Sequence, residues 1–226
     1  MLDELVQQYC DQDKHDEEER LCRRTLEACD EAPNPVHPQI VAMLHRLARC
    51  CYSRGKLDEA ELVYQHIMTI CERPSRHFLR FNSVTPLNGL ASVYRGQGRL
   101  DEAESACRRA LAICEASPSP NPLHLADSLA DLANVCRDQA KHEEAEPLFQ
   151  RALDILEEED RIGPDHLRVG EVLTDMAAMH ASQGKRDQAV EACQRAIAIF
   201  ERSASVSHPS CVRAREILAD ITGREQ

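Results

Sequence analysis

Eleven cysteines and ten histidines are the residues of this 226-residue chain best suited to metal or redox chemistry. Structural zinc sites and dithiol redox centres usually contain a Cys-x-x-Cys spacing, which does not occur in this sequence. An odd number of cysteines, behind an N-terminus without the features of a signal peptide, favours reduced thiols in a reducing compartment. We therefore expect no metal, no cofactor and a cytoplasmic location.

Catalytic patterns are equally incomplete. His142-Glu143 lacks the second histidine of a zinc protease helix. A segment that begins at Asp11 starts like a calcium loop, but its sixth position is Asp16 instead of glycine and it lacks the terminal glutamate. Serine, histidine and aspartate do not occur in an order that indicates a catalytic triad. The sequence therefore predicts that the protein is not an enzyme.

The overall charge excludes two further classes of partner. Thirty-nine carboxylates stand against twenty-seven lysines and arginines, which gives a formal net charge of −12. Such a chain is poorly suited to the phosphate backbone of nucleic acids or to anionic lipid surfaces. Its apolar stretches are also shorter than the roughly 20 residues that a membrane-spanning helix needs. We expect no nucleic acid and no membrane as partner.

An internal repeat determines where these side chains lie. Segments of the form Leu-x-x-Leu-Ala begin at Leu44, Leu87 and Leu129, and related segments begin at Leu2, Leu173 and Arg215. Successive starts are 42, 43, 42, 44 and 42 residues apart. We place the repeats at approximately 1–36, 37–79, 80–121, 122–165 and 166–207, followed by a terminal capping helix at 208–226. The chain 1–226 is thus predicted to form a single array.

Each repeat reads as two helices. Apolar residues at offsets zero, three, four and seven from the leading leucine form one helical stripe. A Gly-Lys or Gly-Arg step then ends the first helix with a left-handed glycine, and Asp or Glu begins the second. Prolines between the repeats are expected to end the second helix. Eight cysteines fall in columns that are apolar in other repeats, so we expect them to be buried: Cys22, Cys29, Cys51, Cys71, Cys107, Cys114, Cys136 and Cys193.

These features resemble the tetratricopeptide repeat (TPR). The alternation of small and large positions, with alanines such as Ala110, Ala152 and Ala196 near the end of each repeat, carries the resemblance. The 42-residue period and the segments at 144–153 and 163–166 are more similar to the kinesin light chain type. The resemblance implies an all-α fold, a right-handed superhelical solenoid of stacked antiparallel helix pairs. It also implies a histidine with a structural role in the loops, at His37, His166 and His208.

The first helices of such an array line its concave wall. Offsets one, five and eight should face this wall because the buried stripe occupies the other positions. In the fifth repeat these offsets are Thr174, Ala178 and Ala181. The middle three repeats place polar and basic side chains there, and we predict a peptide-binding groove that contains His45, Arg49, Tyr52, Asn88, Ser92, Arg95, Asn134 and Arg137.

This wall is locally basic although the protein is acidic. Arginine forks bind carboxylates, and asparagine amides can pair with a peptide backbone. The leading hypothesis is a non-catalytic protein-interaction scaffold that binds an acidic linear peptide, similar to a kinesin light chain cargo-binding domain. A plainer alternative is that these side chains pair with Asp127, Asp131 and Asp138. A second functional hypothesis is a structural or regulatory module that acts through self-association or intramolecular packing.

Overall fold

A computed structural model describes residues 38–72, 83–158, 163, 165–203 and 205–223, and the chain divides into two compact units. Unit 1 comprises residues 1–113 and unit 2 comprises residues 114–226. Every regular element in the described ranges is an α-helix, which confirms the expected all-α class. None of these helices is long and apolar enough to cross a membrane. Repeat 1–36, with Cys22 and Cys29, lies outside the described residues, and so does His37.

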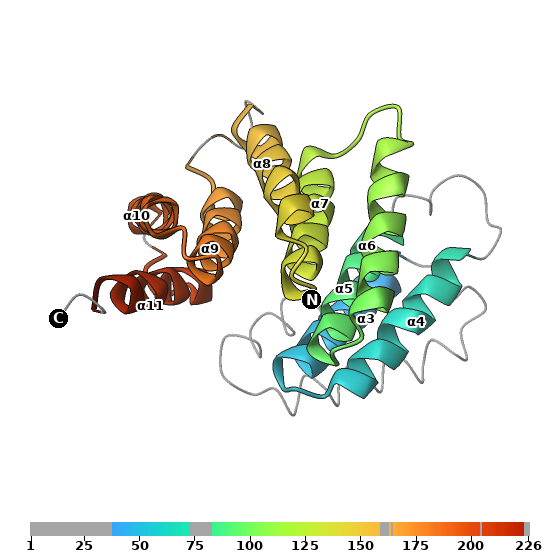
Figure 1. The fold of residues 1–226 in the computed structure, drawn as a ribbon. Coiled ribbons are helices and arrows are strands. Elements are labelled where there is room, and N and C mark those ends of the chain that lie inside the picture. Colours follow the sequence, from blue (N-terminus) through green and yellow to red (C-terminus); the bar gives the residue numbers. More distant parts are fainter. Residues whose placement is uncertain (1–37, 73–82, 159–162, 164, 204, 224–226) are drawn as a thin grey trace. The chain divides into compact units, whose positions relative to one another are not determined.

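Unit 1 is built from helices that pack in chain order (Figure 1). α3 (Pro38–Ser53) packs against α4 (Leu57–Glu72), and both contact α5 (Val84–Gly96). α6 (Leu100–Glu115) follows α5 after a short turn and continues into the first residues of unit 2. The expected arrangement of adjacent helix pairs is therefore present here.

Unit 2 repeats this arrangement and adds a final single helix. Its pairs are α7 (Pro122–Asp138) with α8 (His142–Glu158), and α9 (Leu167–Ser182) with α10 (Arg186–Arg202). α8 also packs against α9. The last helix, α11 (Pro209–Gly223), packs against both α9 and α10. Ile217 and Leu218 of α11 extend the buried cluster of Ala177, Ala192 and Cys193, and so join α11 to the unit 2 core.

The leucine stripe forms the core of both units. Leu44, Leu87 and Leu129 are almost completely buried, and so are the alanines four residues after them. The cysteine prediction is confirmed for its six described members, which are buried and carry reduced thiols: Cys51, Cys71, Cys107, Cys114, Cys136 and Cys193. Tyr64 and Phe149, which occupy the column of Cys107 and Cys193, are buried as well. Cysteine therefore acts here as a small core residue.

One left-handed residue ends each first helix. Gly55, Gly98 and Gly184 have φ angles of 73°, 76° and 71°, as predicted, and Ala140 takes the same place with a φ of 60°. The backbone N–H of the following residue donates to the carbonyl five positions earlier, as Lys141 does to Cys136 at 2.8 Å. This hydrogen bond satisfies a carbonyl that the helix end would otherwise leave without a donor.

Helix starts follow simple electrostatics. The second helices begin with the expected acidic residues, which complement the positive end of the helix dipole: Asp58 and Glu59, Asp101 and Glu102, Glu143 and Glu144, and Asp187. The prolines between repeats were expected to end the second helices, but three of them begin the next helix. Pro38, Pro122 and Pro209 are the first residues of α3, α7 and α11, where the missing N–H has no intrahelical partner to lose.

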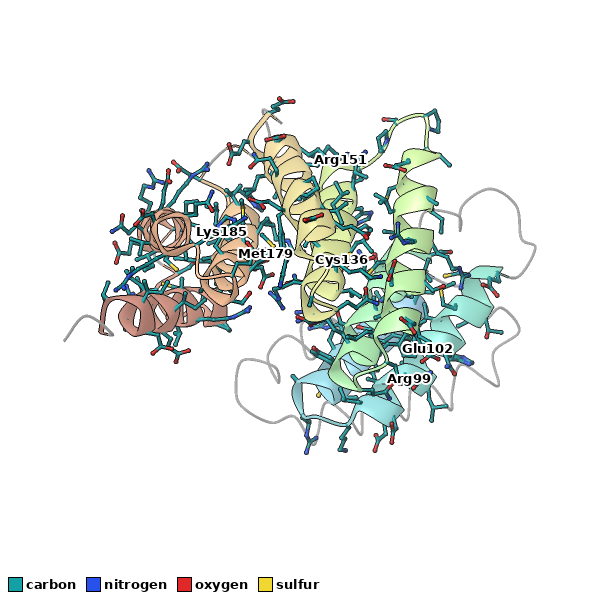
Figure 2. All side chains as sticks on the ribbon, viewed as in Figure 1. Arg99, Glu102, Cys136, Arg151, Met179 and Lys185 are labelled. Carbon is teal, nitrogen blue, oxygen red and sulfur yellow. The ribbon has the colours of Figure 1, made fainter. Side chains whose placement is uncertain are left out.

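Ion pairs connect the second helices of successive repeats at equivalent positions. An arginine contacts a glutamate at the end of the preceding second helix in Arg109–Glu72, Arg151–Glu115 and Arg195–Glu157, with distances of 3.5, 2.8 and 2.5 Å. A second pair of this kind joins the turn before a second helix to the preceding one: Arg99–Glu61 and Lys185–Glu146, both at 2.8 Å. Arg99 also binds Glu102 at the start of α6 (Figure 2). Exposed pairs contribute little individually, but here they link the repeats.

Candidate functional site

α3 presents a cation and an aromatic ring one helical turn apart. Arg49 is exposed, and it forms no ion pair with any described residue. Tyr52 is 39% exposed, whereas Tyr64 of α4 is only 5% exposed. Residues three positions apart lie on the same face of a helix. The predicted members Arg49 and Tyr52 are therefore both accessible on one face of α3.

His45 adds hydrogen-bonding capacity to this face and no charge at neutral pH. Its half-buried ring lies edge-on to the ring of Tyr64, with centroids 5.8 Å apart. Burial and, as the smaller cause, the positive charge of Arg49 together lower the pKa of His45 to about 4. The basic character of the predicted wall in unit 1 therefore comes from its arginines alone.

α5 brings its three predicted residues to the same unit. Asn88, Ser92 and Arg95 are all half-buried on this helix. The end of α5 lies against α3, because a Cβ at Gly96 would be 3.8 Å from the Tyr52 ring. Tyr52 and Arg95 thus belong to the same end of the α3–α5 pair. The structure brings six of the eight predicted residues into unit 1.

A close contact between backbone and ring explains how α5 sits on α4. A Cβ at Gly89 would lie 2.3 Å from Cζ of Tyr64, so only glycine fits beside this buried ring. In unit 2, a Cβ at Gly170 of α9 would lie 2.9 Å from Cζ of Phe200 in α10. Small residues in first helices therefore make room for the few large aromatic rings of the core.

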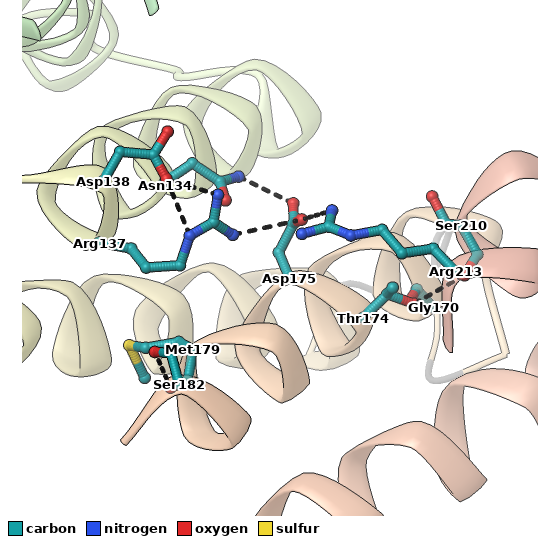
Figure 3. A network of polar contacts seen from close by, with 10 residues as sticks. All are labelled: Asn134, Arg137, Asp138, Gly170, Thr174, Asp175, Met179, Ser182, Ser210 and Arg213. Atoms are coloured by element: carbon teal, nitrogen blue, oxygen red, sulfur yellow. Dashed lines mark hydrogen bonds and ion pairs between the residues drawn. The ribbon is translucent and has the colours of Figure 1, made fainter. Parts of the chain in front are cut away.

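The two remaining predicted residues lie in unit 2 and are held by internal contacts (Figure 3). Asn134 is only 4% exposed, and its amide N–H donates to Asp175 at 2.8 Å. The side chain of Arg137 is 12% exposed; its Nε and Nη2 donate to Asp138 at 3.0 and 2.8 Å, and its Nη1 lies 3.7 Å from Asp175. Of the alternative partners considered from the sequence, Asp138 is thus the one that Arg137 contacts.

Asp175 of α9 is the centre of this network. Besides Asn134 and Arg137 of α7, it accepts a hydrogen bond from Arg213 of α11 at 2.7 Å (Figure 3). Sequence reasoning missed both Asp175 and Arg213, which lie outside the offsets assigned to the wall. The expectation for Thr174 was wrong, because this residue is 1% exposed and its hydroxyl donates to the carbonyl of Gly170.

Two atoms of this network keep capacity for a further hydrogen bond. Within the described part of the chain, Oδ1 of Asn134 has no donor and Nη1 of Arg137 has no acceptor within hydrogen-bond geometry, although both atoms are buried. Buried polar atoms are normally satisfied, so each marks a place where a polar partner would be favourable. The α7 face can therefore offer a ligand one acceptor, Oδ1 of Asn134, and one donor, Nη1 of Arg137.

The cysteines and histidines show the structural roles expected of them. Burial raises the pKa of the Cys71 and Cys114 thiols, and it raises that of Cys193 to about 11, so these thiols are protonated at neutral pH. His166 caps α9 through Nδ1, which accepts from the N–H of Arg168, and His208 accepts likewise from Ser210. Among the described residues, no cluster of three potential ligands could hold a metal ion.

Comparisons with known proteins are consistent with this geometry. A family model described as "Tetratricopeptide repeat" matches residues 1–73 and 83–158, and a second model with the same description matches residues 169–210. Together they cover both units. Among curated proteins, none matches the sequence.

Several solved structures share the fold at low sequence identity. A Podospora anserina protein with kinesin light chain-like repeats is 21% identical, with a TM-score of 0.68 and coverage of 89% of this chain and 93% of that one. BtubC from P. vanneervenii is 20% identical, with a TM-score of 0.66 and coverage of 92% of each chain. PlcR from Bacillus thuringiensis, solved with the peptide PapR7 and DNA, is 15% identical, with a TM-score of 0.68 and coverage of 91% and 70%. At these low identities, the TM-scores show a common fold alone.

Proposed function

The chain belongs to the tetratricopeptide repeat family, and on that premise we propose that it is a non-catalytic protein-interaction scaffold. Its ligand is a linear peptide segment with acidic residues, held by the first helices of the repeats. In unit 1 the site comprises the six predicted residues of α3 and α5, of which Arg49, Tyr52 and Arg95 make the contacts that select the acidic side chains.

The observation that carries this proposal is the accessible pair of Arg49 and Tyr52 on α3. An exposed guanidinium can bind a carboxylate through two parallel hydrogen bonds. An exposed tyrosine beside it supplies apolar area together with a hydroxyl, the combination that dominates many protein interfaces. Gly96 brings the end of α5, which carries Arg95, against this tyrosine. A peptide that lies along α3 and α5 would meet two cations and one aromatic ring.

Known structures of this fold support the choice of ligand class. PlcR, whose fold is similar over most of this chain, was solved in complex with a peptide. The kinesin light chain-like repeats share the fold over 89% of this chain, which supports a repeat array as the part that binds the ligand. In its most specific form, the proposal is a peptide-binding role similar to that of a kinesin light chain cargo-binding domain.

The chemistry of the cysteines supports a cytoplasmic, non-catalytic role. The described cysteines are buried with reduced thiols, and the pKa values of three of them are raised. Such thiols are poor nucleophiles and are suited to a reducing compartment. They act in packing, and the interaction surface is left to the polar side chains.

Fluorescence anisotropy with a labelled peptide tests the proposal. The probe is a ten-residue peptide with six glutamates around one central leucine, and its counterpart carries six lysines. We expect the glutamate peptide to bind and the lysine peptide not to bind. Arg49→Ala and Arg95→Ala should each weaken binding about fivefold to tenfold, which corresponds to about 1–1.4 kcal/mol.

Arg108→Ala is the matched control, because this α6 arginine is similarly exposed and pairs with Glu104 of its own helix at 2.7 Å. It should leave affinity unchanged. Equal binding of the two peptides, or equal affinity of wild type and Arg49→Ala, would refute acidic-peptide recognition. If neither peptide binds and light scattering shows a mass that rises with concentration, the self-association hypothesis replaces it.

A further inference from the structure

Asp175 occupies the place where a peptide carboxylate would bind on the α7 face. We infer that it is a specificity-determining residue: an internal carboxylate that engages Asn134 and Arg137 and so excludes acidic side chains from the α7–α9 face of unit 2. The inference deepens the proposed function, on which it rests for its peptide measurements, by assigning selection of acidic residues to unit 1 and their exclusion to the α7–α9 face of unit 2.

The contacts of Asp175 are those expected of a bound acidic ligand. Its Oδ2 accepts from the amide of Asn134 at 2.8 Å, and its Oδ1 accepts from Arg213 at 2.7 Å and lies 3.7 Å from Nη1 of Arg137. Two hydrogen-bond donors and one further guanidinium, from two other helices, thus converge on one carboxylate (Figure 3). A carboxylate from outside would have to displace this one, which is tethered to α9 and present at a very high effective concentration.

The charges of the network already balance. Arg137 and Arg213 contribute two positive charges, and Asp138 and Asp175 contribute two negative charges. A further carboxylate would add a negative charge next to two existing ones and would find no uncompensated guanidinium. Like charges at this distance repel, and repulsion of a wrong ligand is a common source of specificity.

The equivalent position in unit 1 has no side chain. Gly89 follows the leading leucine of α5 by two positions, as Asp175 follows that of α9. The buried ring of Tyr64 fills the space that a side chain at Gly89 would need, so this place cannot carry a carboxylate. Arg49 of α3 is therefore left exposed, whereas Arg137 of α7 is held internally.

The α7 face keeps a different recognition capacity. Asn134 is oriented by its bond to Asp175, which leaves its buried Oδ1 without a donor among the described residues. This oxygen can accept a hydrogen bond from a backbone N–H. The ligand that fits the α7 face of unit 2 is therefore a segment of uncharged residues that donates a backbone N–H to this oxygen.

Asp175→Asn tests the inference because it removes the charge and keeps the shape. The matched control is Glu171→Gln, which removes one negative charge from the same helix one turn earlier, where Glu171 pairs with Arg168 and His208. With the six-glutamate peptide, Asp175→Asn should raise affinity about fivefold and Glu171→Gln less than twofold. Arg137→Met should change affinity less than twofold in the wild type and remove the gain in the Asp175→Asn background.

A measurement without peptide separates this inference from the proposed function. The Nε–H NMR signal of Arg137 is followed while sodium acetate is added at constant ionic strength. The signal should stay in place in the wild type and shift in Asp175→Asn. If no peptide binds but acetate acts as expected, the proposed function fails and the assignment of Asp175 stands.

The inference is overturned if acetate shifts the signal equally in both proteins, or if Asp175→Asn and Glu171→Gln raise peptide affinity equally. It is also overturned if Arg137→Met weakens wild-type binding as much as Arg49→Ala does. Asp175→Ser, a smaller uncharged substitution, replaces Asp175→Asn if circular dichroism shows that the latter does not fold.

Discussion

α3 of unit 1 and α7 of unit 2 are equivalent first helices that use their polar side chains in different ways. Arg49 and Tyr52 on α3 are exposed to solvent, whereas on α7 Asn134 is buried, Arg137 is half-buried, and both contact Asp175 of α9. The difference comes from the following helix, which carries Gly89 in one unit and Asp175 in the other. Repetition of the backbone therefore does not imply repetition of the binding surface.

The largest expected effect concerns Gly89, which occupies in unit 1 the position that Asp175 occupies in unit 2. Gly89→Ala should lower the free energy of unfolding by about 2–3 kcal/mol, since its Cβ would lie 2.3 Å from the buried Tyr64 ring. Urea unfolding followed by circular dichroism measures the loss. In a Tyr64→Leu background the same substitution should cost much less, because the smaller side chain leaves room. An equal cost in both backgrounds would contradict the packing argument.

The second expected effect is a dependence of the free energy of unfolding on pH, which arises from His45 in unit 1. The pKa of His45 is lowered to about 4 in the folded state, so the stability it contributes is complete above its unfolded value of 6.5. That contribution is lost as the pH falls from 6.5 to 4, since the unfolded chain takes up the proton first. By pH 5 the loss is about 1–2 kcal/mol.

Unfolding of the wild type and His45→Gln at pH 7.5 and pH 5 measures this contribution. The wild type should lose more stability than the variant over that interval. Parallel losses in the two proteins would show that His45 does not contribute to the pH dependence.

The third comparison is between the two arginines. Arg137→Met should lower the free energy of unfolding by about 1–2 kcal/mol, because it removes contacts with Asp138 and Asp175 from a half-buried network. Arg49→Met should stay within about 0.5 kcal/mol of wild type. Both substitutions keep the aliphatic stem, so the difference reports the charge contacts. Thermal and urea unfolding measure both variants. If the two substitutions lower the free energy of unfolding equally, the charge contacts of Arg137 do not contribute more to stability than those of Arg49.

The smallest effect concerns the turns. Ala140 of unit 2 has a φ of 60° at the position where Gly98 of unit 1 has a φ of 76°. Ala140→Gly should raise the free energy of unfolding by about 0.5–1 kcal/mol, and Gly98→Ala should lower it by about 1 kcal/mol. Opposite signs in the two units are the expected result. A loss of stability in Ala140→Gly would show that flexibility of the unfolded chain outweighs the relief of strain.

Much of the fold could be predicted because the signals are local. The first-helix stripes, the left-handed glycines and the acidic helix starts all follow from spacings within one turn or from the two ends of one helix. The buried cysteines could be predicted because repeats can be aligned column by column. The prolines were predicted only to end helices. The same residue that cannot continue one helix is also well suited to begin the next.

The candidate site could be predicted only in part. Offsets within a repeat identified Asn134 and Arg137, but not Asp175, which is 41 residues from Asn134. This contact depends on how one first helix lies against the next, which spacing along a single helix does not specify. A search for opposite charges at offset eight of one repeat and offset two of the next could have found the pair of Arg137 and Asp175.

By itself, the sequence determined the repeat, the helix pairs and the residues of the core, because apolar periodicity and helix capping act over a few neighbouring positions. Only the tertiary structure decided which polar side chains remain available for a partner. Asp175 and Gly89 occupy the same place in their repeats, yet a carboxylate in one and a tyrosine ring beside the other give the two faces different chemistry. Burial and charge pairing between residues about 40 positions apart are set by the packed helices.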